Sequence, residues 1–269
     1  MSERYKTFFG LSKEPFQSNI PIKDILVTHE VKDVSERFKY AVRSGAIAVV
    51  TGDVGAGKST ALRWVISGMH HSDFKIIHVT ATSGSILEFY RQLVSELDLD
   101  LSSNSKAVLI QHIKRCIYEL VREKRQQPVI VVDEASLLRL EVFTELHTLT
   151  QFECDSKPWL PIIMVGQNIL LDRLSFRKSA PLASRVIARS HLSAIGREEM
   201  KVYLNHHLKC VGATADIFSE ESHTAIFQGS GGILRKANHL ARGAMIAASK
   251  EKRSTVTPVD VKKASSEIF

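Results

Sequence analysis

The sequence is poor in cysteine and has no long hydrophobic run. Its three cysteines, Cys116, Cys154 and Cys210, lie far apart with no Cys-x-x-Cys pair, so we expect free thiols in a reducing compartment and no zinc site. No apolar stretch approaches the roughly 18 to 20 residues needed to span a bilayer, and the first residues lack the apolar core of a signal peptide. Internal repeats, low-complexity segments and long linkers are absent too. These absences predict a soluble, cytoplasmic protein.

The composition is that of a globular chain with an excess of positive charge. The 269 residues are 44% hydrophobic, enough for a substantial core, and the chain length favours one α/β domain with a smaller attached domain. Lys and Arg number 36 against 29 Asp and Glu, a net charge of +7. This balance favours an anionic partner.

A complete phosphate-binding pattern, G-x-x-x-x-G-K-S, follows the apolar run 46–51 and precedes a helix-like segment over 60–69. Glycines let the backbone N–H groups point at phosphate oxygens, while the lysine reaches the β and γ phosphates and the serine hydroxyl ligates Mg²⁺. The helix that follows presents its positive end to the same anion. The pattern predicts a site for ATP and Mg²⁺ at Gly52, Asp53, Val54, Gly55, Ala56, Gly57, Lys58, Ser59 and Thr60.

Two carboxylates, Asp133 and Glu134, end the β-branched run 129–132, which suits a strand buried on both faces. Beside a phosphate-binding loop, Asp133 is predicted to hold Mg²⁺ and Glu134 to act as general base toward the attacking water. The alternative is a pair of acids favoured by the dipole of a helix over 135–149.

Strand and helix patterns alternate along the first two thirds of the chain, which predicts a five-stranded parallel sheet with flanking helices. The strands are expected at 46–51, 75–80, 128–133, 160–165 and 186–192, with helices at 84–97 and 105–125. From Arg197 only helical patterns remain, at 197–211, 219–228, 233–249 and 258–268. We therefore expect a nucleotide-binding α/β domain over 46–196, preceded by a lead segment over 1–45 that belongs to it, and a helical lid over 197–269.

Several segments resemble the AAA+ ATPases of the group that contains the secretion ATPase ExeA and the transposition regulators MuB, TnsC and TniB. Besides the two motifs above, they are Phe8-Phe9-Gly10-Leu11 with Glu14-Pro15-Phe16, Met164-Val165-Gly166-Gln167, Ser184-Arg185-Val186, and the run from Gly232 to Asn238. The pattern is most similar to the ExeA-like branch. The resemblance extends over nearly the whole chain.

The resemblance implies roles for three further polar residues. Gln167 is the sensor that orients the attacking water, with Asn168 or a plain turn as alternatives, and Arg235 is the lid arginine that reaches the nucleotide. Arg185 is the arginine finger that one subunit inserts into its neighbour's site, although Arg173, Arg177, Arg189 and Arg197 lie nearby and a solvated basic face is an alternative. Leu234 stands where family members often have proline, which loosens the placement of Arg235.

Phe8, Phe9 and Phe16 resemble a segment that packs near the adenine, and a small cluster that holds down the terminus is an equal alternative.

Two functions follow from the resemblance. In the first, ATP drives assembly of a homo-oligomeric ring or filament on duplex DNA, which regulates a transposase; Lys106, Lys114, Arg115 and Arg122 are candidate phosphate contacts, or else a solvated helix face. In the second, the protein is a secretion-associated ATPase that powers assembly of an envelope complex. Because the chain ends at Phe269 without the membrane segment and cell-wall module of ExeA, we expect the DNA function. A nucleotide-gated scaffold with little turnover is a third possibility, which the presence of Glu134 disfavours.

Overall fold

The computed structural model describes residues 2–267, and the chain in it divides into two compact units. A sheet unit consists of residues 28–52 and 58–192, and a helical unit of residues 1–27, 53–57 and 193–269. Among the described residues, no helix combines the length and the hydrophobicity needed to cross a bilayer. The two units are described in turn.

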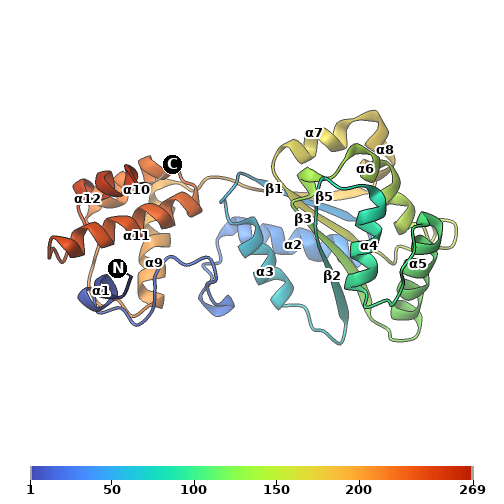
Figure 1. Ribbon diagram of the computed structural model, residues 1–269, viewed down its shortest axis with the longest axis horizontal. Coiled ribbons are helices and arrows are strands. Elements are labelled where there is room, and N and C mark those ends of the chain that lie inside the picture. Colours follow the sequence, from blue (N-terminus) through green and yellow to red (C-terminus); the bar gives the residue numbers. More distant parts are fainter. Residues whose placement is uncertain (1, 268–269) are drawn as a thin grey trace. The chain divides into compact units, whose positions relative to one another are not determined.

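Five parallel strands form the sheet, in the order β2-β3-β4-β1-β5 (Figure 1). This confirms the predicted sheet, with each strand within two residues of its expected position. The central strands are buried throughout because helices cover both faces. The strands are β1 (Ile47–Gly52), β2 (Phe74–Thr80), β3 (Gln127–Asp133), β4 (Ile162–Gly166) and β5 (Val186–Leu192).

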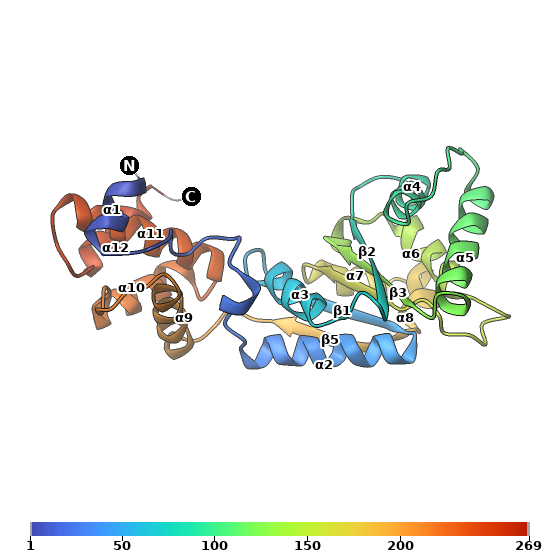
Figure 2. The same ribbon diagram turned by 90° about the horizontal axis from the view of Figure 1, so that it is seen from below.

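The strand order determines which helices cover each face. From β1 the chain crosses to β2 at the far edge, and every later connection returns in the opposite direction. Since such crossovers are right-handed, the first connection lies on one face and the later ones on the other. Figure 2 shows α3 on one side of the sheet and α4, α5 and α6 on the other, with α2 alongside β5. The helices are α2 (His29–Ser44), α3 (Lys58–Ser67), α4 (Ile86–Glu96), α5 (Lys106–Arg122), α6 (Leu140–Leu146), α7 (Ile169–Ser175) and α8 (Ala180–Ala183).

The segment after β3 is not the single helix expected over 135–149. It consists of a 3-10 turn, η2 (Ala135–Leu137), then α6 and a second 3-10 turn, η3 (His147–Thr150). The helical path is interrupted because Leu138 and Arg139 adopt extended ψ angles of 138° and 153°. The dipole of a helix beginning at Ala135 therefore does not account for the acids at 133 and 134.

The helical unit packs its helices around small and aliphatic side chains. In α11 (Leu234–Lys250), Ala237, Leu240, Ala241, Ala244, Met245 and Ala248 recur at helical spacing and are buried. The other elements are α1 (Ser2–Phe8), the 3-10 turn η1 (Ile22–Asp24), α9 (Arg197–Cys210), α10 (Glu220–Ser230) and α12 (Pro258–Ser265). Ile268, the expected end of the last helix, lies outside the described residues.

Residues 2–27 pack within the helical unit, which differs from the expected grouping of residues 1–45 with the sheet domain. Tyr5, Leu11 and Phe16 belong to the hydrophobic core of the helical unit. The Tyr5 hydroxyl donates a hydrogen bond to the Glu14 carboxylate, and burial raises the pKa of this tyrosine. The apolar side chains of this segment are thus used in the packing of the helical unit.

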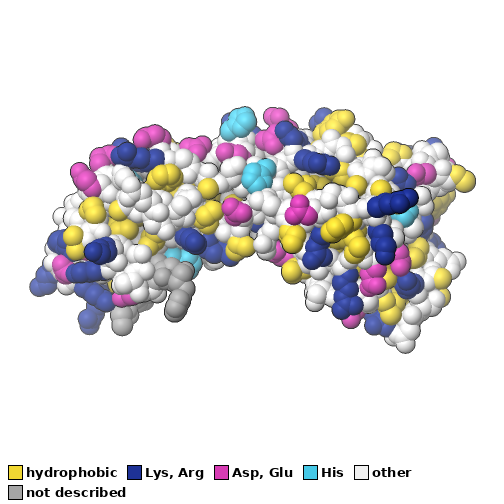
Figure 3. All heavy atoms as spheres, turned by 90° about the horizontal axis from the view of Figure 1, so that it is seen from above, with side chains coloured by type: hydrophobic (Ala, Val, Ile, Leu, Met, Phe, Trp, Pro, Cys, Tyr) yellow, Lys and Arg dark blue, Asp and Glu magenta, His cyan; other side chains and the backbone are white. Residues whose placement is uncertain are grey.

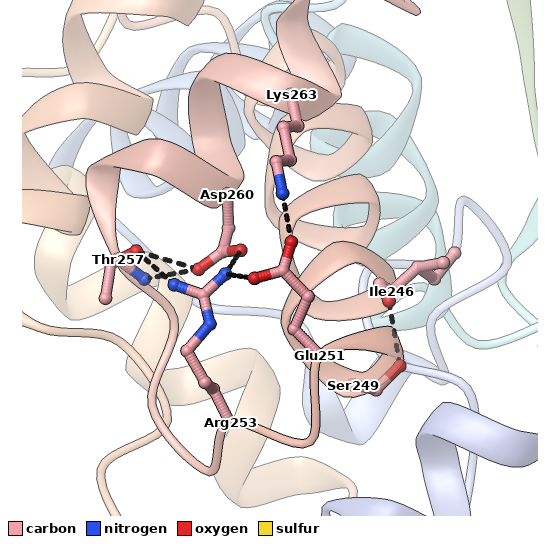
Figure 4. Close-up of polar contacts among 7 residues, drawn as sticks. All are labelled: Ile246, Ser249, Glu251, Arg253, Thr257, Asp260 and Lys263. Atoms are coloured by element: carbon pink, nitrogen blue, oxygen red, sulfur yellow. Dashed lines mark hydrogen bonds and ion pairs between the residues drawn. The ribbon is translucent and has the colours of Figure 1, made fainter.

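A polar network holds α12 against the end of α11 (Figure 4). Asp260 is fully buried, and its carboxylate accepts hydrogen bonds from the N–H and hydroxyl of Thr257, both at 2.9 Å, and from Arg253 at 2.5 Å. The Arg253 guanidinium also donates to Glu251 at 2.8 Å, and Glu251 in turn pairs with Lys263. Asp260 therefore caps α12 and neutralises the arginine at once.

Asp260→Asn should destabilise the helical unit by about 2 to 4 kcal/mol, because Arg253 loses its buried counter-charge. The control is Glu251→Gln, an exposed partner of the same arginine, which should have a much smaller effect because solvent screens its charge. Chemical denaturation of the whole chain measures both changes. Equal effects from the two variants would contradict this role of Asp260.

His207 lies in the core of the helical unit. Its ring stacks on that of Phe16, with 5.5 Å between the ring centroids, and is tilted against that of Tyr203, with 4.4 Å between the centroids. Burial, with the nearby charge of His206 as the second cause, lowers the pKa of His207 from 6.5 to about 4. The unfolded chain therefore binds the proton more tightly than the folded chain. The contribution of neutral His207 to the unfolding free energy is fully present above pH 6.5 and is lost as the pH falls through about 4.

We expect the unfolding free energy of the helical unit to fall by about 3 kcal/mol between pH 7 and pH 4 through this residue. His207→Phe should flatten the dependence, leaving the part due to His223, whose pKa burial also lowers. His239→Ala, at an exposed position, serves as the control and should keep the unaltered slope. A His207 variant with that same slope would show the assignment to be wrong.

Candidate nucleotide-binding site

The phosphate-binding pattern forms the turn between β1 and α3. β1 ends at Gly52 and α3 begins at Lys58, as the motif requires. Gly55 and Gly57 have φ angles of +86° and +98°, which L side chains rarely adopt. Asp53 and Val54 are exposed, Ala56 is buried and Thr60 is half-buried. The loop therefore has the curled backbone of a phosphate cradle.

The sheet unit brings Lys58, Ser59 and Asp133 to the carboxyl edge of the sheet. Lys58 is buried, and its Nζ donates to the Gly52 carbonyl at 2.8 Å. The Ser59 hydroxyl donates to Asp133 Oδ2 at 3.4 Å, although 74 residues separate them in the chain. Both are oxygen ligands of the kind that Mg²⁺ prefers, and their separation suits two neighbouring positions around one small ion. The two predicted metal ligands, Ser59 and Asp133, are therefore suited to hold Mg²⁺.

Glu134 has the left-handed conformation, with φ 51° and ψ 33°. Its N–H donates to Asp133 Oδ1 at 2.8 Å. A non-glycine residue pays about 1 to 3 kcal/mol for such a backbone, and residues of this kind cluster at functional sites. The conformation turns the chain sharply at the end of β3.

Gln167 follows the end of β4 and is exposed, as is Asn168. In the sheet, Gly166 pairs with Thr51, so Gln167 follows a strand that ends level with β1, where the phosphate-binding loop begins at Gly52. The Gln167 N–H donates to the hydroxyl of Ser136 at 3.4 Å. Sequence reasoning missed Ser136, because its burial and its bond to Gln167, 31 residues away, are set by the tertiary structure.

In the helical unit, Arg235 lies beside the tip of the phosphate-binding loop. Its N–H donates to the Gly55 carbonyl at 3.1 Å, and a Cβ at Gly55 would lie 2.7 Å from the Arg235 Cβ. Similarly, a Cβ added at Gly57 would lie 3.2 Å from Leu234 Cδ1. The start of α11 therefore holds the loop through its backbone even though Leu234 replaces proline. The Arg235 side chain itself is exposed.

Arg185 precedes β5, at the amino edge of the sheet, and its carbonyl accepts from the Ile47 N–H at the start of β1. Six residues of β1, about 20 Å of strand, separate this edge from the phosphate-binding loop of the same sheet. The Arg185 guanidinium donates to the Asp155 carboxylate at 2.6 Å and to the Thr150 hydroxyl at 3.3 Å. A catalytic role for Arg185 therefore requires another subunit's site and release from Asp155.

The aromatic residues of the first segment have different environments. Phe16 is buried between His207 and Phe218 in the helical core, whereas Phe8 is 40% exposed and contacts Phe9 edge to face. Phe16 therefore belongs to a cluster that packs the first segment against the helical core, the second of the two alternatives for these aromatic residues.

Residues 42–174 match a family described as an AAA domain. This segment is an AAA domain. It contains the phosphate-binding loop, both acids and Gln167, while Arg185 and Arg235 lie beyond its matched range. The match confirms the AAA part of the predicted resemblance.

Two curated proteins are similar in sequence to this chain, one from a secretion pathway and one from a bacteriophage. General secretion pathway protein A of Aeromonas hydrophila is 27% identical over 267 residues, which are 98% of this chain and 48% of that protein. ATP-dependent target DNA activator B of Escherichia phage Mu is 25% identical over 178 residues, 65% of this chain and 53% of that protein. The chain spans about half the length of these two relatives.

Solved structures share the fold at low sequence identity. Cdc6p of Pyrobaculum aerophilum superposes with a TM-score of 0.72 at 16% identity, covering 98% of this chain and 71% of that one. The Holliday junction branch migration motor RuvB of Thermotoga maritima has a TM-score of 0.52 at 19% identity, with coverages of 89% and 68%. The AAA domain here therefore has the fold of the P-loop AAA+ ATPases.

Gly55→Ala should lower ATP affinity at least about tenfold, because the new Cβ meets Arg235 and the backbone must leave its φ of +86°. The matched control is Gly10→Ala, at φ +64° with nothing within 4 Å of the added Cβ, which should leave affinity within about twofold. Titration with a fluorescent ATP analogue measures both. Equal losses in the two variants would contradict a local effect on the loop.

Proposed function

We propose that this protein is a Mg²⁺-dependent ATPase whose ATP-bound form assembles on duplex DNA and regulates a transposase. The observation that supports hydrolysis is the convergence of Ser59, Asp133, Glu134 and Gln167 at one edge of the sheet, beside the start of the phosphate-binding loop. Each supplies a part that phosphoryl transfer to water requires.

The proposed roles follow from the position of each group. Ser59 and Asp133 hold Mg²⁺, which when bound neutralises charge on the phosphate oxygens. Lys58 places its ammonium group among those oxygens, and Glu134 accepts the proton of the attacking water. Gln167 orients that water. Arg235 reports on the bound nucleotide from the start of α11.

Arg185 completes the site of a neighbouring subunit in this proposal. Its position at the amino edge of the sheet supports a role between subunits, because its own loop lies at the opposite edge. Asp155 holds the guanidinium until assembly places a more negative partner nearby. Hydrolysis then depends on the oligomer, whether a ring or a filament.

The DNA function is supported by the net charge of +7 and by the similarity to the phage Mu target DNA activator. Basic and acidic side chains are interspersed on the face shown in Figure 3. Contacts with DNA phosphates would be sequence-independent, since backbone phosphates carry no base information.

The candidate cations of α5 all have partners within the chain. Lys106 pairs with Glu145 at 2.9 Å, Arg122 with Glu153 at 3.3 Å and Arg115 more loosely with Glu119 at 3.8 Å. Lys114 donates to the Gln151 carbonyl at 2.9 Å, and burial lowers its pKa. These contacts support the structural alternative for α5, so the proposal places the DNA phosphates elsewhere.

A secretion-associated ATPase is the second candidate. The similarity to general secretion pathway protein A extends over 98% of this chain, further than the similarity to the phage protein. The two candidates share the nucleotide chemistry and differ in the partner.

Binding to a labelled DNA duplex distinguishes the candidates. With ATP and Mg²⁺ we expect tight binding and large particles by light scattering, with ADP neither, and an affinity that falls steeply with salt. If the ATP form hydrolyses ATP but neither binds DNA nor assembles, the secretion function is favoured.

Glu134→Gln should lower the rate of ATP hydrolysis about 100-fold or more, because the amide cannot accept the proton of water. The variant should therefore accumulate as the ATP-bound assembly. The control is Glu141→Gln, the same change at an exposed position of α6, which should leave turnover within about twofold. A phosphate-release assay gives the rates. Turnover in Glu134→Gln equal to that of the unaltered chain would remove this residue as the base.

A further inference from the structure

The turn after β3 carries the proposed general base in a strained backbone. Glu134 is left-handed, and the chain then closes into η2 through the Leu137 N–H, which donates to the Glu134 carbonyl at 2.8 Å. A second bond joins the Leu138 N–H to the Ala135 carbonyl at 3.2 Å. Such a backbone persists only where its surroundings hold it.

Ser136 is the residue of this turn that abuts the neighbouring strand end. It is 3% exposed, and its hydroxyl accepts the Gln167 N–H at 3.4 Å. The approach is close, because a Cβ at Gly166 would lie 2.9 Å from the Ser136 nitrogen and 3.2 Å from its hydroxyl oxygen. The absence of a side chain at Gly166 is therefore what lets the turn and the end of β4 meet.

A second link joins the same two segments on the other side of Gln167. The Arg173 guanidinium of α7 donates to the Leu138 carbonyl at the end of the turn. The turn over 134–138 and the segment over 166–173 are thus fastened at two points. Of the two links, Ser136 is nearer to the chemistry, two residues from Glu134 and one hydrogen bond from Gln167.

We propose that Ser136 is a positioning residue that sets the spacing between Glu134 and Gln167. This inference rests on the proposed ATPase function. Base and orienting group must act on the same water molecule, and a misplacement of about 1 Å can cost a factor of about 100 in rate. The Ser136 hydroxyl makes no contact with nucleotide in this proposal and acts through the backbone of Gln167.

Two variants test the hydroxyl. Ser136→Ala removes the acceptor while the backbone bonds of η2 remain, and Ser136→Cys keeps a side chain of similar size with a weak acceptor. Both should lower kcat about tenfold, with KM and ATP affinity within about twofold and an unchanged melting temperature. Ser222→Ala, at a fully buried serine of α10, is the control and should leave kcat within about twofold. A serine role that is merely structural would lower the melting temperature instead.

A double-mutant cycle with Gln167→Ala shows whether Ser136 acts through Gln167. We expect the tenfold effect of Ser136→Ala to shrink below about twofold once the Gln167 side chain is gone. The same factor in both backgrounds would overturn the inference, as would normal kcat in Ser136→Ala and Ser136→Cys. Absence of turnover in the unaltered chain with ATP, Mg²⁺ and DNA would overturn the ATPase proposal together with it.

Discussion

The parallel pairing of β3, β4 and β1 is the constraint on which the rest of the site depends. Parallel strands point their carboxyl ends in one direction, so three segments far apart in the sequence must turn at one edge of the sheet. Gly52, Asp133 and Gly166 end these strands. Backbone hydrogen bonding in a buried sheet thus brings the start of the phosphate-binding loop, the acids and Gln167 to one edge without any attraction between their side chains.

Close backbone approach then refines the geometry. At Gly166 the strand end touches the turn at Ser136, and at Gly55 the loop touches the start of α11 in the helical unit. A single Cβ at either position would meet neighbouring atoms at less than 3.0 Å. Glycine is therefore required for spacing at both places, and at Gly55 its φ of +86° requires glycine for conformation as well.

The helical unit contributes by a different kind of packing. Its core is built from alanine and aliphatic residues of α11, a buried histidine and the aromatic side chains of the first segment. The phosphate-binding residues 53–57 belong to this unit by their contacts, and Arg235 holds them by its main chain. Any movement of α11 would consequently be felt by the loop backbone directly, independent of the Arg235 side chain.

Local sequence patterns determined the parts of this protein that depend on near neighbours. The alternation of strand and helix patterns predicted all five strands, and the spacing of Gly52 to Ser59 predicted the loop between β1 and α3. They did not predict the break at Leu138, the partner of Ser136 or the place of Phe16, since each depends on a residue distant in the chain. Tertiary structure alone decided that Phe16 stacks on His207, that Arg185 pairs with Asp155 and that Lys106 pairs with Glu145. Periodicity records which face of an element is buried, whereas only packing records what lies against it.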